Sequence, residues 1–235
     1  MKSLGGNVWF MAAIAAALIS PASVAGAADL ESAMARGGRL YDKWFGETKA
    51  EKPTENHAAY PVDGQYGKDA SWRCKECHGW DNLGKDGAYG SGKHATGIVG
   101  IRGALGADPA RIAALLRDAT HGYTEAQLSA ADAQDLALFV TQGQIDMTPF
   151  IDPATKKPVG DGVKGEAYYN TLCAGCHGVD GTKIREAPLG SVADNVPEML
   201  HKIWNGQPGE AMPALRALDH RIAADIVVHL QTFPK

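Results

Sequence analysis

Four cysteines, arranged in two pairs, are the residues of this sequence whose types and spacing most directly imply chemistry. Two residues separate the members of each pair and a histidine follows at once, giving the runs Cys74-Lys75-Glu76-Cys77-His78 and Cys173-Ala174-Gly175-Cys176-His177. Two thiols at this spacing could form a disulfide in an oxidising compartment, or bind zinc or act as a redox pair in the cytosol. None of these roles explains why a histidine follows the second cysteine in both runs.

The Cys-x-x-Cys-His pattern is the attachment signature of c-type haem. Two thiols add across the two vinyl groups of one porphyrin, and the imidazole of the next residue then reaches the iron. The two pairs also lie too far apart in the sequence for a compact zinc ribbon. The sequence therefore predicts two haem c groups with His78 and His177 as iron ligands, attached through Cys74, Cys77, Cys173 and Cys176. All four cysteines of the chain are then used.

At these motifs the chain resembles the class I c-type cytochromes, and specifically dihaem proteins built from two such modules in tandem. In that family three or more helices wrap one haem, with a histidine on one side of the iron and usually a methionine on the other. The resemblance implies an all-α fold of two tandem cytochrome c-type domains, over residues 29–145 and 165–235. It is closest from Gly165 to Phe233.

The second module carries the family pattern most fully. Helices are expected from Gly165 into Cys173, from Glu198 to Trp204 and from Ala223 to Phe233, the last packing across the first. Asp219 is expected to cap the last helix. The resemblance also implies that Pro188 offers its carbonyl to the second ring nitrogen of the proximal histidine, a bond that orients such a ligand.

The run Gly209-Glu210-Ala211-Met212-Pro213 looks like the distal-ligand loop of the family, which makes Met212 the expected second ligand of this haem. A thioether favours ferrous iron, so His/Met ligation raises the reduction potential. Met212 could instead fill the core, because methionine adapts to irregular packing; Met199 is the next candidate ligand in that case. The remaining histidines of this module are expected at the surface or at helix edges: His201, His220 and His229.

The first module follows the same plan with insertions. Helices are expected from Arg36 to Trp44, from Ile112 to Ala119 and from Ala130 to Gln142, the last capped by Ser129. The polar stretch of residues 45–70 has no counterpart in the second module and is expected to be a surface excursion over the haem edge. A glycine-rich loop, residues 84–103, replaces a shorter segment, and the proline-containing residues 146–164 are expected to link the modules.

His121 is the expected distal ligand of the first haem. The two closing helices can be aligned by placing Ser129 on Asp219. At that offset Met212 corresponds to Gly122, and the neighbouring residue is His121. It also lies just after the middle helix, where the ligand loop of the family begins.

Three rivals to His121 stay open from the sequence. No methionine lies between His78 and the end of the closing helix. The rivals are therefore Met147, just after that helix, His94 in the glycine-rich loop, and an iron with no second protein ligand. If His121 is the ligand, the first haem is bis-histidine ligated and should have the lower potential of the two.

The first 28 residues are predicted to be a secretory signal peptide. Lys2 is followed by an apolar run from Val8 to Ile19 and then by small residues, with cleavage expected after Ala27 or Ala28. The run is shorter than the roughly 20 residues that a membrane-spanning helix needs. An uncleaved anchor is the competing interpretation. The mature protein is expected in the periplasm, without an integral membrane segment.

The resemblance implies electron transfer, and the net charge and the motifs that the sequence lacks argue against several other functions. The formal net charge is −4, with 23 basic and 27 acidic residues, so the chain lacks the basic footprint of a nucleic-acid binder. It also lacks a phosphate-binding glycine fingerprint, a zinc-protease motif and a serine nucleophile elbow. The expected partners are a redox protein that donates electrons and one that accepts them.

Enzymatic chemistry is the main rival to a carrier. Dihaem thiosulfate dehydrogenases resemble this chain in size and number of modules, but the well-known type uses a cysteine thiolate on its active haem. Here every cysteine is used for attachment. Bacterial dihaem peroxidases are normally considerably longer. The same motifs would also suit an electron-accepting subunit of an oxidoreductase, or a haem-based ligand sensor.

Overall fold

The structure, a computed structural model, describes residues 22–235 and contains no β-strand among them. Its α-helices are α1 (Ala22–Glu47), α2 (Cys74–His78), α3 (Pro109–Leu115), α4 (Ala130–Leu138), α5 (Gly162–Leu172), α6 (Ala174–His177), α7 (Leu189–Val192), α8 (Val196–Asn205) and α9 (Arg221–Leu230). Short 3-10 helices cover Lys68–Trp72, Arg102–Ala104 and Thr148–Phe150, and a π-helical turn covers Phe139–Gly143. The all-α class predicted from the sequence is confirmed.

The apolar run predicted as the signal-peptide core, Val8–Ile19, lies outside the described residues. Within residues 22–235 no helix combines the length and the apolar character needed to cross a membrane.

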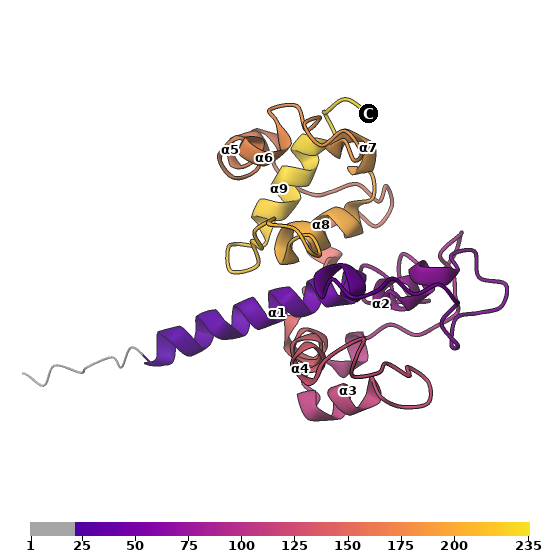
Figure 1. Ribbon diagram of the computed structural model, residues 1–235. Helices are drawn as coiled ribbons and strands as arrows, with labels where there is room; N and C mark the ends of the chain where they lie inside the picture. The colour runs from indigo at the N-terminus through magenta and orange to yellow at the C-terminus, as the bar shows by residue number, and fades with distance from the viewer. Residues whose placement is uncertain (1–21) are drawn as a thin grey trace, which may run out of the picture.

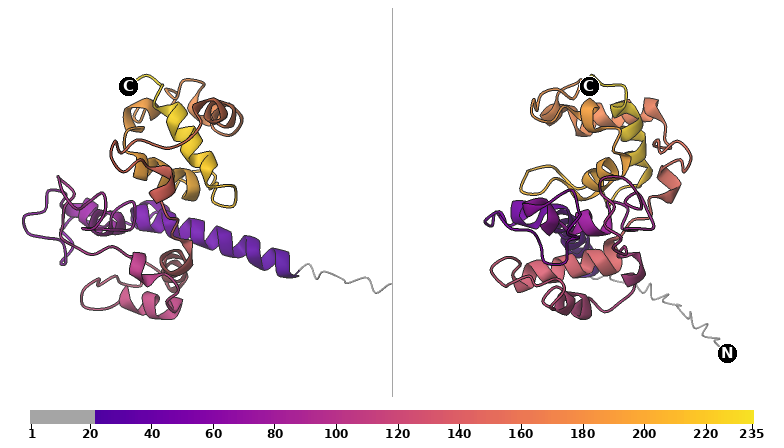
Figure 2. Two further views of the ribbon diagram at one scale, coloured as in Figure 1. Left: turned by 180° about the vertical axis from the view of Figure 1, so that it is seen from behind. Right: turned by 90° about the vertical axis from the view of Figure 1, so that its right-hand side faces the viewer.

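Helix α1 lies between two groups of helices (Figure 1). Helix α4 packs on one side of it and carries α3 on its own surface, and α5 to α9 lie on the other side. The two further views keep this order, with α1 in contact with both α4 and α8 (Figure 2). The backbone of α1 is interrupted at Lys43, whose φ of −159° and ψ of 80° are not helical. The residues beyond this kink, Trp44 and Phe45, are buried in the core formed with α4.

In each group the opening and closing helices cross at a glycine. A Cβ atom on Gly37 of α1 would lie 2.2 Å from the carbonyl oxygen of Asp135 in α4. A Cβ on Gly165 of α5 would lie 1.9 Å from that of Asp225 in α9. Neither crossing has room for a side chain, so glycine allows the backbones to approach. The predicted packing of α9 across α5 is confirmed.

The helix ends follow capping chemistry, with one difference from expectation. Ser129 caps α4 as predicted, through a reciprocal capping box with Asp132. His220 stands at the N-cap position of α9, one residue after the predicted cap Asp219, and makes no side-chain capping bond of its own. The Asp219 carboxylate still accepts a 2.9 Å hydrogen bond from the backbone N–H of Arg221.

The middle helix of the first group begins earlier than expected. Asp108 accepts a 2.9 Å hydrogen bond from the N–H of Ala110, and Pro109 stands at the first helical position. Both features favour a helix start, so α3 spans Pro109–Leu115 instead of the expected 112–119.

Each group has its own apolar core. Residues of α1, α3 and α4 form one, and residues of α5, α8 and α9 form the other. Met147 and Phe150 come from the stretch expected to be a linker, yet both are buried in the second core. Helix α5 also begins at Gly162, within that stretch. The connection is therefore largely docked on the second group of helices.

Buried polar contacts join α1 to α8. Asp42 of α1 is 1% exposed and forms ion pairs with Arg73 and with Lys202, whose Nζ lies 2.7 Å from the carboxylate. His201 of α8 is 2% exposed, and its Nε2 lies 2.9 Å from the carbonyl oxygen of Gly38. The expectation that His201 lies at the surface is wrong, because the face of α8 that carries it packs against α1.

Candidate functional site

A cavity of about 410 Å³ lies inside the first group of helices. Cys74, Cys77 and His78 line it from α2, and His121 lines it from the loop after α3. The rest of the wall is mainly apolar, with Ile98, Val99, Ile101, Ala104, Ile112, Leu115, Leu116, Leu136 and Val140. Cofactor pockets are typically apolar concavities of about 300–1,000 Å³ with a few converging polar groups. The cavity fits a flat apolar group held by two thiols and two imidazoles.

His78 is oriented by a backbone carbonyl. Its Nδ1 lies 2.7 Å from the carbonyl oxygen of Val99, a group that can only accept, so Nδ1 carries the proton. Burial lowers the pKa of His78 and favours the neutral ring. The lone pair of Nε2 is then available to a metal, and the carbonyl fixes the orientation of the imidazole.

His121 faces His78 across the cavity. The two ring centroids are 6.5 Å apart and the ring planes differ by 28°. A metal–imidazole bond is about 2 Å long, and a ring centre lies about 1 Å beyond its nitrogen, so one metal ion between two imidazoles separates their centres by roughly 6 Å. The Nδ1 of His121 lies 3.1 Å from the Asp118 carboxylate, which leaves Nε2 for a metal here as well.

The two rival ligands for this site lie elsewhere. Met147 is buried in the core of the second group. His94 is stacked between the rings of Tyr66 and Tyr89, at centroid distances of 4.2 and 4.6 Å. Its Nδ1 lies 2.7 Å from the Glu76 carboxylate. Neither residue lines the cavity.

Three residues that contact the site histidines were not predicted from the sequence. Val99 bonds to His78, Asp118 to the ring of His121, and His57 to the backbone carbonyl of His121. Asp118 is the one with a sequence signal, since an aspartate three residues before a candidate ligand can bond back to it. His57 comes from the stretch expected to be a surface excursion, but it lines the cavity.

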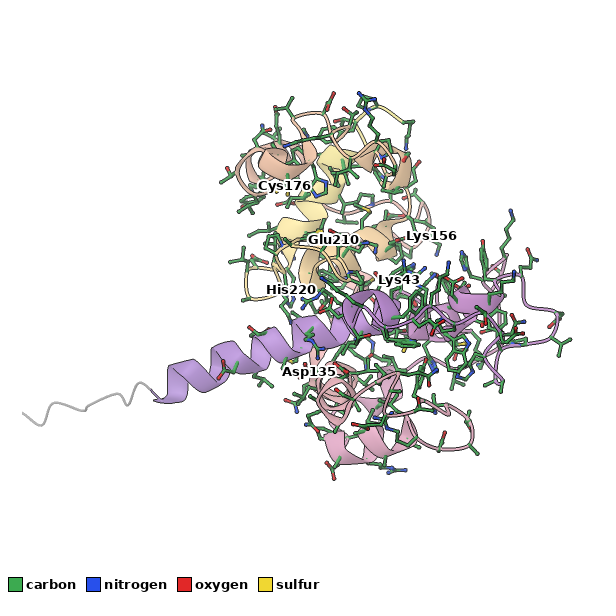
Figure 3. The ribbon with its side chains drawn as sticks, in the orientation of Figure 1. Lys43, Asp135, Lys156, Cys176, Glu210 and His220 are labelled. Atoms are coloured by element: carbon green, nitrogen blue, oxygen red, sulfur yellow. The ribbon has the colours of Figure 1, made fainter. Side chains whose placement is uncertain are left out.

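The second candidate site lies where α5 runs into α6. Cys173 packs against the second core, and Cys176, which belongs to α6 and is labelled in Figure 3, is exposed. The Nδ1 of His177 is buried and has no hydrogen-bond partner within residues 22–235. Burial lowers the pKa of His177, so the ring is neutral. Buried ring nitrogens without a partner are rare, and none of the described residues orients this ring through its Nδ1.

The expected bond between Pro188 and His177 is absent from the described residues. The carbonyl oxygen of Pro188 instead accepts from the backbone N–H of Ser191 at 3.0 Å and from its hydroxyl at 2.6 Å. This prediction is therefore wrong. Pro188 is the N-cap of the short helix α7, and the first turn of that helix uses its carbonyl.

Met212 lies in the loop between α8 and α9. It is partly buried and packs against the same apolar cluster as Cys173. Met199, the other candidate ligand, is 5% exposed within that cluster. The structure thus brings Met212 and Cys173 onto one core.

Both sites share a local construction. The hydroxyl of Tyr41 in α1 donates a 2.6 Å hydrogen bond to the carbonyl oxygen of Gly79, the residue after the first motif. The hydroxyl of Tyr169 in α5 donates an identical 2.6 Å bond to the carbonyl oxygen of Gly178 after the second motif. The two glycines have φ values of +79° and +84°, which L side chains rarely adopt. In each case an opening helix is tied to the turn that follows the histidine.

Residues 160–230 match a protein family described as cytochrome c oxidase, cbb3-type, subunit III. The matched stretch contains the second Cys-x-x-Cys-His run and Met212. No curated protein matched the sequence significantly. The match supports the prediction that the chain is a c-type cytochrome, a class that holds haem c and exchanges electrons with redox partners.

Proposed function

We propose that the chain is an exported dihaem electron-transfer protein that passes electrons between redox partners in the periplasm. The observation that carries this proposal is the pair His78 and His121, which face each other across an apolar cavity beside Cys74 and Cys77. Two imidazoles on opposite sides of one iron leave no position for a substrate. Such a site suits electron transfer better than chemistry on a bound molecule.

Two haem sites are proposed. One is held by Cys74, Cys77, His78 and His121, and the other by Cys173, Cys176, His177 and Met212. The repeated tyrosine–glycine bond and the repeated glycine crossing support two tandem modules. Haem iron supplies the redox chemistry, by alternating between the ferric and ferrous states.

The protein side chains set the conditions for that chemistry. The Val99 carbonyl holds the His78 imidazole and the Asp118 carboxylate holds that of His121. The ligands would therefore move little when the charge of the iron changes. Apolar side chains line most of the first cavity. A thioether ligand at the second site would raise its potential above that of a bis-histidine site. Electrons would then flow from the first module to the second.

A rigid junction favours transfer within one molecule. The buried Asp42–Lys202 ion pair and the His201–Gly38 hydrogen bond fix α8 against α1. Because α1 also packs on α4, both modules are anchored to one helix. The distance between the two sites is then set by packing instead of by a flexible linker.

The periplasmic location is proposed from the sequence. Lys2, the apolar run of residues 8–19 and the small residues after it support a signal peptide that is cleaved after Ala27 or Ala28. Its removal takes away one lysine and no acid, which makes the chain one unit more negative.

The proposal is tested by a redox titration of the purified holoprotein, followed by absorption spectroscopy. Two haems per chain and two resolved midpoint potentials are expected. Thiosulfate and hydrogen peroxide should show no saturable turnover with the isolated protein. Robust turnover of either compound would contradict the carrier assignment and favour a dihaem oxidoreductase related to thiosulfate dehydrogenases.

A further inference from the structure

The loop that carries His121 is held firmly on one side by Asp118. The Asp118 carboxylate accepts hydrogen bonds from the backbone N–H of His121 at 2.8 Å and from that of Thr120 at 2.9 Å. The same oxygen lies 3.1 Å from the His121 Nδ1. Gly122 follows at a φ of +63°, where the chain turns away from the site. These contacts leave the backbone carbonyl of His121 to be held from elsewhere.

His57 holds that carbonyl. The Nε2 of His57 lies 2.8 Å from the carbonyl oxygen of His121. The Nδ1 of His57 accepts a 3.1 Å hydrogen bond from the backbone N–H of Ala59. A neutral imidazole has one donor and one acceptor, so Nε2 carries the proton and donates it to His121. Burial lowers the pKa of His57, which favours this neutral ring.

The His57 ring is itself fixed. The residue is only 8% exposed, and its backbone N–H donates to the Ser71 hydroxyl at 2.9 Å. The ring packs edge-on against Trp72 at 4.5 Å and is tilted against Tyr123 at 5.8 Å. Tyr123 in turn donates a 2.9 Å hydrogen bond to the Trp72 carbonyl. A donor held this rigidly can restrain the atom that it contacts.

We infer that His57 is a positioning residue for the first haem. It clamps the distal-ligand loop from the side opposite Asp118, and so keeps His121 on the iron and external ligands off it. The inference rests on the proposed function, in which His121 is an iron ligand. It also gives the inserted residues 45–70 a role, because they carry His57 to the loop. The second module has no such insertion.

Two substitutions separate the hydrogen bond from the packing. His57→Phe keeps an aromatic ring against Trp72 but removes the donor to the partly buried carbonyl of His121. His57→Gln places an amide N–H near the position of Nε2 and so restores the donor. The readouts are carbon monoxide binding to the reduced holoprotein and low-temperature paramagnetic resonance of the ferric holoprotein.

In the His57→Phe protein we expect carbon monoxide to bind the first haem about tenfold or more faster than in the wild type, in line with the loss of an outer-shell bond. One low-spin ferric signal should broaden or shift. His57→Gln should return the rate of carbon monoxide binding and the ferric signal to their wild-type values. A His57→Phe protein with wild-type carbon monoxide binding and an unchanged ferric spectrum would overturn the clamp.

Two further variants keep the outcomes distinct. His201→Phe removes another buried imidazole that bonds to a backbone carbonyl, that of Gly38 in α1 and not that of His121, and it should leave carbon monoxide binding unchanged. If His201→Phe speeds carbon monoxide binding as much as His57→Phe does, the effect comes from a general loss of packing and the proposed clamp is wrong. His121→Ala tests the premise that His121 is an iron ligand. If that variant leaves carbon monoxide binding and both low-spin signals unchanged, His121 is not the ligand, independently of the result for His57.

Discussion

Both ring nitrogens that would face away from the iron in the first site have partners, whereas the equivalent nitrogen in the second site has none. His78 bonds to the Val99 carbonyl and His121 to Asp118, but the buried Nδ1 of His177 is unpaired among the described residues. The exposed Cys176 also leaves the second site more open at its cysteine edge than the first, whose two cysteines are partly buried.

The difference follows partly from the inserted segments. Residues 45–70 and 84–103 bring His57 and Val99 to the first site, and the second module has no counterpart to the first of these segments. What the modules share is smaller: an opening helix tied to the turn after the histidine, and a closing helix that crosses it at a glycine. The shared parts bring cysteines and histidine onto an apolar core. The insertions add the bonds from Val99 and His57, whereas Asp118, which orients the His121 ring, lies outside both insertions.

Removing one cysteine pair should have the largest effect. Cys74→Ala with Cys77→Ala, or Cys173→Ala with Cys176→Ala, should each reduce the haem content by roughly half, because each pair is proposed to hold one haem. The ratio of haem to protein, measured by pyridine haemochrome absorption, checks this. Haem that acid–acetone extraction removes from the wild-type protein would contradict covalent attachment.

Met212→Ala should reduce the difference between the two reduction potentials. Loss of the thioether should abolish the weak long-wavelength ferric band and lower one midpoint on the order of 0.2 V, within the ~0.8 V range that axial ligands span. The other midpoint should stay in place. Met199→Ala is the matched control, since Met199 belongs to the same core. If the band survives in Met212→Ala and disappears in Met199→Ala, the ligand assignment passes to Met199.

Acid should weaken the junction between the two modules. Burial lowers the pKa of His201 to about 4, well below its ordinary value near 6.5. The unfolded chain therefore binds a proton in the range between these values that the folded chain does not. The free energy of unfolding should fall by on the order of 3 kcal/mol as the pH drops from about 6.5 to about 4.

The measurement is urea unfolding of the wild type and of His201→Gln at several pH values. His201→Gln keeps an N–H donor for the Gly38 carbonyl but cannot titrate, so it should lose this part of the pH dependence. The haem absorption of both modules should change in one transition. Two separate transitions, or equal pH dependence in both proteins, would show that the junction does not couple the modules in this way.

Asp118→Asn should have the smallest effect. The substitution removes a negative charge beside the His121 ring but keeps an oxygen that can accept, so the ligand should stay bound and become less basic. The first midpoint should rise by on the order of 30 mV, where a tenfold change in a one-electron equilibrium is ~59 mV. A redox titration measures it. If the higher midpoint shifts instead, the first site is not the lower-potential, bis-histidine site.

The sequence alone determined the cysteine and histidine positions, the helical class and most helix locations. Covalent attachment of a porphyrin restricts its ligands to a contiguous run, so the motif is complete within five residues. The helices are local as well: Ser129 and Asp132 form a capping box within one turn, which is why that helix start was predictable. His121 could also be selected from the sequence, because aligning the two closing helices needs only the order of residues along the chain.

The tertiary structure decided which groups surround those ligands. Val99 contributes a backbone carbonyl, which no side-chain pattern can reveal, and His57 reaches His121 from 64 positions away in the chain. His201 looked like a surface residue because α8 is amphipathic, and only the packing of α1 against its polar face buries it. Contacts between distant segments depend on how helices pack, and side-chain periodicity records which face of a helix is apolar but not which neighbour covers the other face.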